Sequence, residues 1–286
     1  MAAPTQAAAF VYKDQFEDRV QRRLDEPNVW KEVCEVQFST ARTIHWPFQD
    51  DLTVQTPTRS SAYTYRTLQQ TDETLNINQV ALYAVLLPQA DLAQSGYADM
   101  MDLADRLAAQ IDEQIETHVW QQYSAWEVFD GTDIGGSAGS ITVSSTNVAA
   151  IIRNVRKLIF SGKGSSLLAK NGGFMVWHEG DFEKLEAFAQ ANGFMLADEI
   201  LRDGIRIGIK HQGFYHYTSN LLPAGFMVGG VKKIIKVGVL TSTYGNLLID
   251  PNDPAQVRGT GVRLAADYGV KTFEVGGSLV FNIAVA

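Results

Sequence analysis

The segment "MDLADRLAAQIDEQIE" (Met101–Glu116) decides the fold, because it carries the pattern of a long amphipathic helix. The pattern continues on both sides, from about Asp91 to Trp126, and a helix of about 36 residues is roughly 54 Å long. A compact chain of 286 residues has a radius of gyration of only about 19 Å. The helix would cross nearly the whole molecule, so the sequence predicts a flat or elongated subunit.

Apolar and acidic residues along this segment have helical spacing. The apolar residues recur in steps of three and four, and acidic residues fall between them. This arrangement predicts a helix that lies across a sheet with one apolar side and keeps its carboxylates in solvent. The apolar set is Tyr97, Met101, Ala104, Ala108, Ile111 and Ile115, and the acidic set is Asp99, Asp102, Asp105, Asp112, Glu113 and Glu116.

The composition excludes several classes of protein. With 32 acidic and 24 basic residues the formal net charge is -8, which argues against a protein whose main task is to grip nucleic-acid phosphates. Cys34 is the only cysteine, which excludes an internal disulfide and a cysteine-rich metal site. No stretch has the length and apolarity of a membrane span or an export signal. We therefore expect a protein that folds in the cytoplasm and has no membrane partner.

Residues 1–50 have the composition of an arm with little core of its own. Within it, "YKDQFEDRVQRRLDE" predicts a short helix, Phe16–Leu24, that Pro27 stops. Three arginines crowd on this helix and fit either a solvated face or a contact with an acidic partner. They are Arg19, Arg22 and Arg23.

Residues 51–88 predict a long hairpin. The run that begins at Leu52 alternates apolar and polar residues, and "TLNINQVALYAVLL" follows it and is rich in β-formers. Most side chains of the two runs are polar, so a ribbon made from them finds little to bury within its own subunit. The ribbon is therefore either mobile or packed on another molecule.

The rest of the chain mixes helices and strands without a repeating βαβ unit, which indicates the α+β class. The Gly/Ser-rich segment "DGTDIGGSAGSITVSS" separates the long helix from a compact lobe. In the lobe we expect helices at Thr146–Ser161 and in "EGDFEKLEAFAQANG". Strands are expected in "FMVWH", around Gly208 and Gly213, and on both sides of a turn at Gly229-Gly230. The last segment, "RGTGVRLAADYGVKTFEVGGSLVFNIAVA", alternates as strands that return to the long helix.

No residue pattern predicts an active site. "SGKGSS" lacks the spacing of a phosphate-binding loop, and no Gly-x-Ser-x-Gly motif is present. No two histidines form a His-x-x-x-His pair, so each is interpreted as structural. We expect no catalytic residue, metal ion or cofactor; the alternative from another class is an enzyme, such as a hydrolase with a cleft in the C-terminal lobe. The histidines are His45, His118, His178, His211 and His216.

Three segments, taken in order, carry a family resemblance. "INQVALYAVLLPQADLAQSGYADMMDLADRLAAQIDEQI" leads from a β-rich run into the long helix, "GIRIGIKHQGFYHYTSNLLP" reads as strand, turn and strand before an Asn-containing loop, and "AADYGVKTFEVGGSLVFNIAV" reads as closing strands. In their local sequence patterns and in their order, these segments resemble the major capsid proteins of tailed bacteriophages. The resemblance covers about Asp51 to Ala286 and consists of spacing and hydrophobicity, without an invariant motif.

The resemblance implies a division of the chain. Residues 1–50 would be an N-terminal arm, and residues 51–88 an extended loop that lies over a neighbouring subunit. Residues 89–139 and 245–286 would form a peripheral domain stiffened by the long helix as a spine. Residues 140–244 would form an axial domain around five- and six-fold centres. A shell tile must be thin and wide, and one long helix stiffens its width.

The resemblance also implies a function and partners. The chain would self-assemble in the host cytoplasm, as hexamers and pentamers, into the icosahedral head shell that encloses the phage DNA genome, and would remain in the virion. Scaffolding, portal and decoration proteins would be candidate partners, and packaged DNA would lie nearby without sequence-specific binding. An encapsulin, a cellular shell of the same fold, is the alternative. An encapsulin is expected to have an N-terminal helix that docks cargo peptides, and the Phe16–Leu24 helix is too short and too charged to favour this role.

One variant of the family links a loop lysine covalently to an asparagine of a neighbouring subunit. Here no lysine occurs between Lys31 and Lys157, so the hairpin has no such nucleophile. We therefore expect a shell held together without covalent links.

Charged residues in the hairpin are expected to contact other subunits. Between Asp51 and Glu127 the only cations are Arg59, Arg66 and Arg106, amid many acids. Because the guanidinium fork suits interface carboxylates, we predict that Arg59 or Arg66 pairs with an adjacent subunit. The alternative is two solvated arginines on a flexible loop. The candidate carboxylates are Asp99, Asp102 and Glu113.

Overall fold

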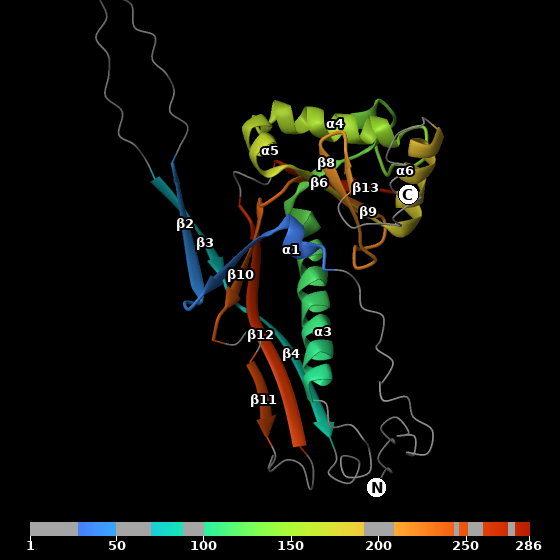
Figure 1. Ribbon diagram of the computed structural model, residues 1–286. Helices are drawn as coiled ribbons and strands as arrows, with labels where there is room; N and C mark the ends of the chain where they lie inside the picture. Colours follow the sequence, from blue (N-terminus) through green and yellow to red (C-terminus); the bar gives the residue numbers. More distant parts are fainter. Residues whose placement is uncertain are drawn as a thin grey trace, which may run out of the picture.

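One long helix and the sheet beneath it form a narrow body, and a second sheet with helices forms a wider lobe at one end (Figure 1). The computed structural model describes residues 28–49, 70–87, 100–191, 209–242, 246–250, 260–273 and 278–286. This mixture of separate helices and largely antiparallel strands confirms the α+β class. None of the described helices has the length and apolarity needed to cross a membrane.

Helix α3 (Met100–Trp120) confirms a long helix at the predicted place. The α-helix ends at Trp120, earlier than the predicted Trp126. The 3-10 turn η2 (Gln121–Ala125) follows it, and Trp126 already has extended backbone. Residues 91–99, where the sequence pattern begins, lie outside the described residues.

The buried side of α3 differs in part from the predicted one. Leu107 and Ile111 are buried against the sheet, whereas Ala108 is exposed. Asp112 and Glu116, which we expected in solvent, are only 7% and 1% exposed. The buried stripe is therefore wider than the apolar pattern, because these two carboxylates have polar partners inside the molecule.

The sheet of the body is built around its longest strand, β12 (Thr260–Thr272). Among the described strands, β4 pairs with one edge of β12, β10 and β11 follow one another along the other edge, and β1 lies parallel to β10. The rings of His118 on α3 and Tyr268 on β12 meet edge to face at 5.5 Å, so this closing strand does return to the long helix. The other strands are β1 (Glu35–Ser39), β4 (Gln79–Leu87), β10 (Ile235–Leu240) and β11 (Asn246–Asp250).

Residues 28–49 do not form the coreless arm that the sequence suggested. Helix α1 (Trp30–Val33) buries Val29, Trp30 and Val33 beneath α3 and the lobe, and β1 joins the sheet. Three apolar side chains within five positions supply the missing core contact. The predicted Phe16–Leu24 helix lies outside the described residues.

A two-stranded ribbon projects from the body (Figure 1). Its strands are β2 (Thr43–Gln49) and β3 (Gln70–Asn76), paired antiparallel. The first strand thus comes from the predicted arm, and β4, expected in the hairpin, belongs to the sheet of the body. Ala81 explains this placement, because it is buried in the core beside α3. Residues 50–69 lie outside the described residues.

The lobe has a sheet in the order β5-β13-β9-β6-β8-β7, within the described residues. Helices α4 and α6 pack on one face through Ile151, Ile159 and Phe182, and the other face joins the core of the body. Helices α4 and α6 and strand β6 confirm the sequence prediction for this region, whereas helix α5 was not predicted. The elements are β5 (Glu127–Phe129), α4 (Val148–Ser161), α5 (Ser165–Asn171), β6 (Gly173–Trp177), α6 (Glu179–Ala191), β7 (Ile209–His211), β8 (Phe214–Thr218), β9 (Phe226–Val231) and β13 (Val280–Ala284).

The predicted turn at Gly229-Gly230 is wrong, because both residues lie inside β9. These glycines allow close packing: a Cβ on Gly230 would meet the Leu279 carbonyl oxygen at 2.5 Å. The chain turns later, at Lys233, which has a φ of 66°.

Candidate assembly surfaces

The ribbon crosses the outer face of the body sheet, the face turned away from α3, at a notch made by two glycines. Gly238 of β10 and Gly269 of β12 are directly opposite in the strand register. A Cβ on Gly238 would meet the Leu75 side chain at 2.7 Å and that of Ile44 at 2.9 Å. The absence of both Cβ atoms therefore lets the base of the ribbon seat its apolar side chains on the sheet.

Two lysines next to the notch hold the ribbon electrostatically. Lys236 and Lys271 are also opposite each other in the strand register, and only the pair Val237 and Val270 lies between them and the two glycines. Lys271 Nζ donates to the Thr74 carbonyl at 3.0 Å and lies 3.6 Å from the Glu73 carboxylate. Lys236 Nζ binds Glu35 and stands 5.8 Å from the centre of the Trp46 ring. The base of the ribbon is thus fixed by apolar and charged contacts together.

An apolar stripe lies on the same outer face, on β4. Val80 and Leu82 are 63% and 61% exposed, while Ala81 between them is buried toward α3. Side chains alternate along a strand, so Val80 and Leu82 point away from the helix. We call this pair the β4 stripe. Two large aliphatic side chains exposed together are typical of a contact surface.

Glu116 connects the body to the lobe. One carboxylate oxygen accepts from the backbone N–H groups of Val29 at 2.9 Å and Trp30 at 3.4 Å. The other accepts from Trp120 Nε1 at 3.0 Å and from the Ser219 hydroxyl, beyond β8, at 2.7 Å. Burial raises the pKa of the Glu116 carboxyl, and these four hydrogen bonds partly oppose that effect.

A second carboxylate one turn earlier strengthens the same junction. Asp112 Oδ2 lies 2.5 Å from Lys31 Nζ and accepts from Asn28 Nδ2 at 3.2 Å. Burial raises the pKa of the neighbouring Cys34 thiol, and the Glu116 charge raises it further, so the thiol stays protonated. The contacts of Asp112 and Glu116 with residues in and before α1 fix this helix on α3.

Four titratable groups of the lobe have structural partners. His216 Nδ1 accepts from Trp177 Nε1 at 3.0 Å in the core, and His178 Nε2 donates to the Pro223 carbonyl at 3.2 Å. Lys232 donates to the Tyr217 hydroxyl at 2.5 Å, and burial raises the pKa of Tyr217 to about 12. Across the described residues, no group of three His, Cys, Asp or Glu side chains is placed to hold a metal ion.

Comparison with known proteins identifies the fold. No family model matches the sequence, and no curated protein matches it either. The structure is similar to that of Mycobacterium phage Che8, with a TM-score of 0.67 and 13% identity over 97% of this chain and 98% of that one. The capsid of Ralstonia phage GP4 has a TM-score of 0.67 and 8% identity over 100% and 98% of the two chains. The capsid of a native GTA particle gives 0.65 and 14% over 97% and 96%. The chain has the tailed-phage capsid protein fold.

Within this capsid fold, the predicted contact residues are only partly described. Arg59, Arg66 and Asp99 lie outside the described residues. Asp102 is in the first turn of α3, and Glu113 accepts from Gln110 Nε2 at 3.1 Å on the same helix. Their contacts with other subunits remain a prediction.

Sequence reasoning missed the contacts that organise the capsid fold at its junctions. Glu116 is the clearest case, because its acidic neighbours made it look like part of a solvent face. A signal was present: Asp112 and Glu116 are four residues apart, on the side of Ile111 and Ile115. The Gly238–Gly269 pair had no local signal, since only the strand register brings the two glycines together.

Proposed function

We propose that the protein is a major capsid protein that self-assembles into the icosahedral head shell of a tailed bacteriophage, around its DNA genome. The observation that carries this proposal is a likeness to phage capsid structures that spans nearly the full length of both chains. The narrow body, wide lobe and projecting ribbon suit a thin tile that overlaps its neighbours. The protein would assemble from hexamers and pentamers in the host cytoplasm and remain in the virion, with a structural and not a catalytic role.

In this proposal the body is the peripheral domain and the lobe is the axial domain. The proposed division places 89–139 and 245–286 in the first and 140–244 in the second. Three strands support an exchange of segments between these two domains: β10, from 140–244, pairs in the sheet of the body, whereas β5 and β13, from 89–139 and 245–286, pair in the sheet of the lobe. The apolar faces favour the same exchange, since Val237 packs in the core of the body and Ile283 in that of the lobe.

The ribbon is proposed to lie over an adjacent subunit and to cover its β4 stripe. The stripe and the ribbon base share the outer face of the sheet, so a neighbouring ribbon that crosses this face would reach Val80 and Leu82. Covering about 100 Å² of aliphatic surface would contribute about 2.5 kcal/mol to each contact. Arg59 or Arg66 would add an ion pair with Asp99, Asp102 or Glu113 of the neighbour.

Other partners follow from the same role. Scaffolding, portal and decoration proteins are proposed partners, and packaged DNA is proposed to lie near the shell without sequence-specific contacts. An encapsulin shell is the second candidate function, because it has the same fold. The likeness to phage capsids favours the viral role.

Electron microscopy of the purified full-length chain tests the proposal. We expect closed particles with pentamers and hexamers, at high protein concentration or in the presence of a scaffolding protein. Particles from producing cells should contain DNA. A chain that stays monomeric under all these conditions contradicts the proposal, and particles filled with a host enzyme instead of DNA favour the encapsulin function.

A further inference from the structure

The lobe separates its charges along the chain. Between Asp133 and Glu179 the sequence contains no acidic residue, although the whole chain has a net charge of -8. The cations of this stretch all belong to α4, α5 and the turn that joins them. They are Arg153, Arg156, Lys157, Lys163 and Lys170.

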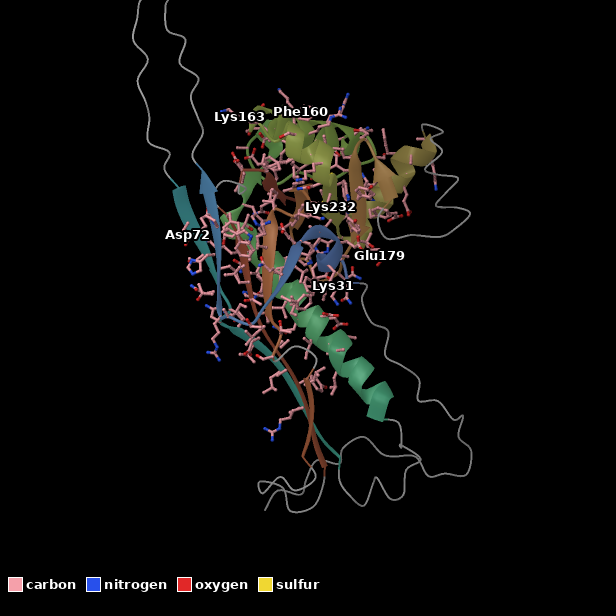
Figure 2. The ribbon with its side chains drawn as sticks, turned by 60° about the vertical axis from the view of Figure 1, so that its left-hand side comes forward. Lys31, Asp72, Phe160, Lys163, Glu179 and Lys232 are labelled. Carbon is pink, nitrogen blue, oxygen red and sulfur yellow. The ribbon has the colours of Figure 1, made fainter. Side chains whose placement is uncertain are left out.

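Three of these cations lie beside an aromatic ring on the outward side of α4. Arg153, Lys157 and Phe160 are exposed and follow one another at helical spacing, while Ile152 and Ile159 are buried beneath them. Phe160 is 52% exposed at the upper edge of the lobe (Figure 2). A hollow of about 450 Å³ is lined by Arg153, Arg156, Lys157, Phe160 and Ser161. We call this the α4 surface.

Helix α6 carries the opposite charge. Its 13 residues include four carboxylates and one lysine, Lys184. Glu179 and Glu183 are exposed one turn apart, while Phe182 is buried against the sheet. Burial raises the pKa of the Glu186 carboxyl, and the charge of Glu183 raises it further. We call the side with Glu179 and Glu183 the α6 surface.

The two surfaces lie on different parts of the lobe. Helix α4 runs along its upper edge and α6 covers one end (Figure 1), and in Figure 2 Phe160 of the α4 surface lies well apart from Glu179 of the α6 surface. Each copy therefore offers one basic surface and one separate acidic surface. When the contact patch of one subunit differs from that of the next, the contact is head-to-tail, and it closes into a ring if the rotation fits.

We propose that the α4 surface of one subunit binds the α6 surface of the next, and that this contact sets the order of lobes around each ring. Lys157 and Glu183, central on the two exposed stripes, are the pair expected to meet. The inference depends on the proposed shell function and adds the charged contact within its rings. Arginine and exposed aromatic residues are enriched at protein interfaces, which suits Arg153 and Phe160.

Nucleic acid is the other polyanion that a basic surface fits. Two observations favour a second copy of the chain. The matching acidic surface is present on the same lobe, and the cations surround a half-exposed phenylalanine, which a protein contact would bury.

A charge exchange tests the contact. Lys157→Glu and Glu183→Lys should each raise the critical concentration for assembly roughly tenfold, since like charges would face each other in every ring. The double variant restores opposite charges across the contact and should return to within about twofold of the parent chain. The mismatched double Lys157→Glu with Glu127→Lys has the same net charge and should stay impaired. Thermal unfolding of the unassembled subunits verifies that each variant folds.

Each other outcome overturns the inference. If both single variants assemble like the parent, or the matched double is no better than the mismatched one, the two surfaces do not meet. If Lys157→Glu leaves assembly intact but lowers the DNA retained per particle, the partner of the α4 surface is nucleic acid. A parent chain that forms no closed particle contradicts the shell function itself, which separates the two failures.

Discussion

Gly238 and Gly269 face each other across β10 and β12, and the base of the ribbon occupies the space that their side chains would fill. The pair therefore sets where the ribbon crosses the sheet. Lys236 and Lys271, also opposite each other, bind the ribbon on the side next to the notch. The direction in which the ribbon leaves its subunit depends on this small region of two strands.

Gly269→Ala should displace the ribbon. The added Cβ would lie 2.2 Å from the Asn76 carbonyl oxygen, a backbone atom that moves only with β3. We expect the free energy of unfolding to fall by about 2 kcal/mol, as for other overpacked sites, measured by urea unfolding of unassembled subunits. Gly180→Ala is the matched control, because a Cβ there meets nothing within 4 Å. Equal stability of the two variants would mean that the ribbon does not need the notch.

Glu116→Gln should weaken the junction between α1, α3 and the lobe. A glutamine side chain has only one acceptor oxygen, so its amide group would face two of the four donors that Glu116 now satisfies. We expect a loss of about 2 kcal/mol in the free energy of unfolding. Glu113→Gln, a partly exposed carboxylate on the same helix, should change it by less than about 0.5 kcal/mol. A similar effect of both variants would show that the junction does not depend on Glu116.

The effect of Glu116 on stability should depend on pH. Since burial raises the pKa of its carboxyl above the ordinary value of 4.5, the folded chain binds this proton more tightly than the unfolded chain. The stabilisation of the fold by the protonated Glu116 carboxyl is complete below the pKa that this group has in the unfolded chain. It is lost as pH rises through the higher pKa of the same group in the folded chain. The difference between the parent and Glu116→Gln in urea unfolding should therefore shrink as pH rises above the ordinary value of 4.5. A difference that grows with pH would mean that the hydrogen bonds outweigh burial.

Periodicity was sufficient to predict the parts of the fold that depend on local spacing. The apolar pattern around Ile111 and Ile115 placed α3, and the same type of pattern placed α4 and α6. In these helices the residues that pack together are close in the sequence, so one segment contains the whole signal.

Features that depend on distant pairing were not predictable in this way. The ribbon pairs Thr43 with Asn76, which are far apart in the sequence. Neither strand carries a local pattern that selects the other as its partner. Glu116 is buried because Val29 and Ser219 bring donors to it from separate parts of the chain. A carboxylate in an acidic helix has the same local pattern whether or not such donors arrive.

Assembled particles should be held together without covalent links. No lysine occurs between Lys31 and Lys157, and Cys34, the only cysteine, is buried. Boiled particles on a non-reducing denaturing gel should run as one band near 31.5 kDa. A ladder of rings that survives boiling would contradict this prediction.

Replacing both Arg59 and Arg66 with alanine should weaken assembly. An ion pair at the rim of a contact contributes about 0.5 kcal/mol and a desolvated pair about 2 kcal/mol, and a shell repeats the contact in every subunit. We expect the double variant to have a higher critical concentration for assembly at low salt, and this concentration should depend less on salt than it does for the parent chain. Arg106→Ala, the third cation of this stretch, is the control. If the double variant matches the parent chain at both salt concentrations, these arginines do not hold neighbours.

Leu82→Asp should block assembly and leave the subunit folded. Leu82 is 61% exposed on the outer face of β4, so a carboxylate there stays in water in the free subunit and should change its stability by less than about 1 kcal/mol. Under a neighbouring ribbon the same carboxylate would lose water without gaining a partner, which costs several kcal/mol. We therefore expect the critical concentration to rise more than about tenfold, measured by light scattering during assembly. Gln79→Asp adds the same charge on the same strand, but its side chain points to the opposite face, so it should assemble like the parent. Normal assembly of Leu82→Asp would mean that no subunit covers the β4 stripe.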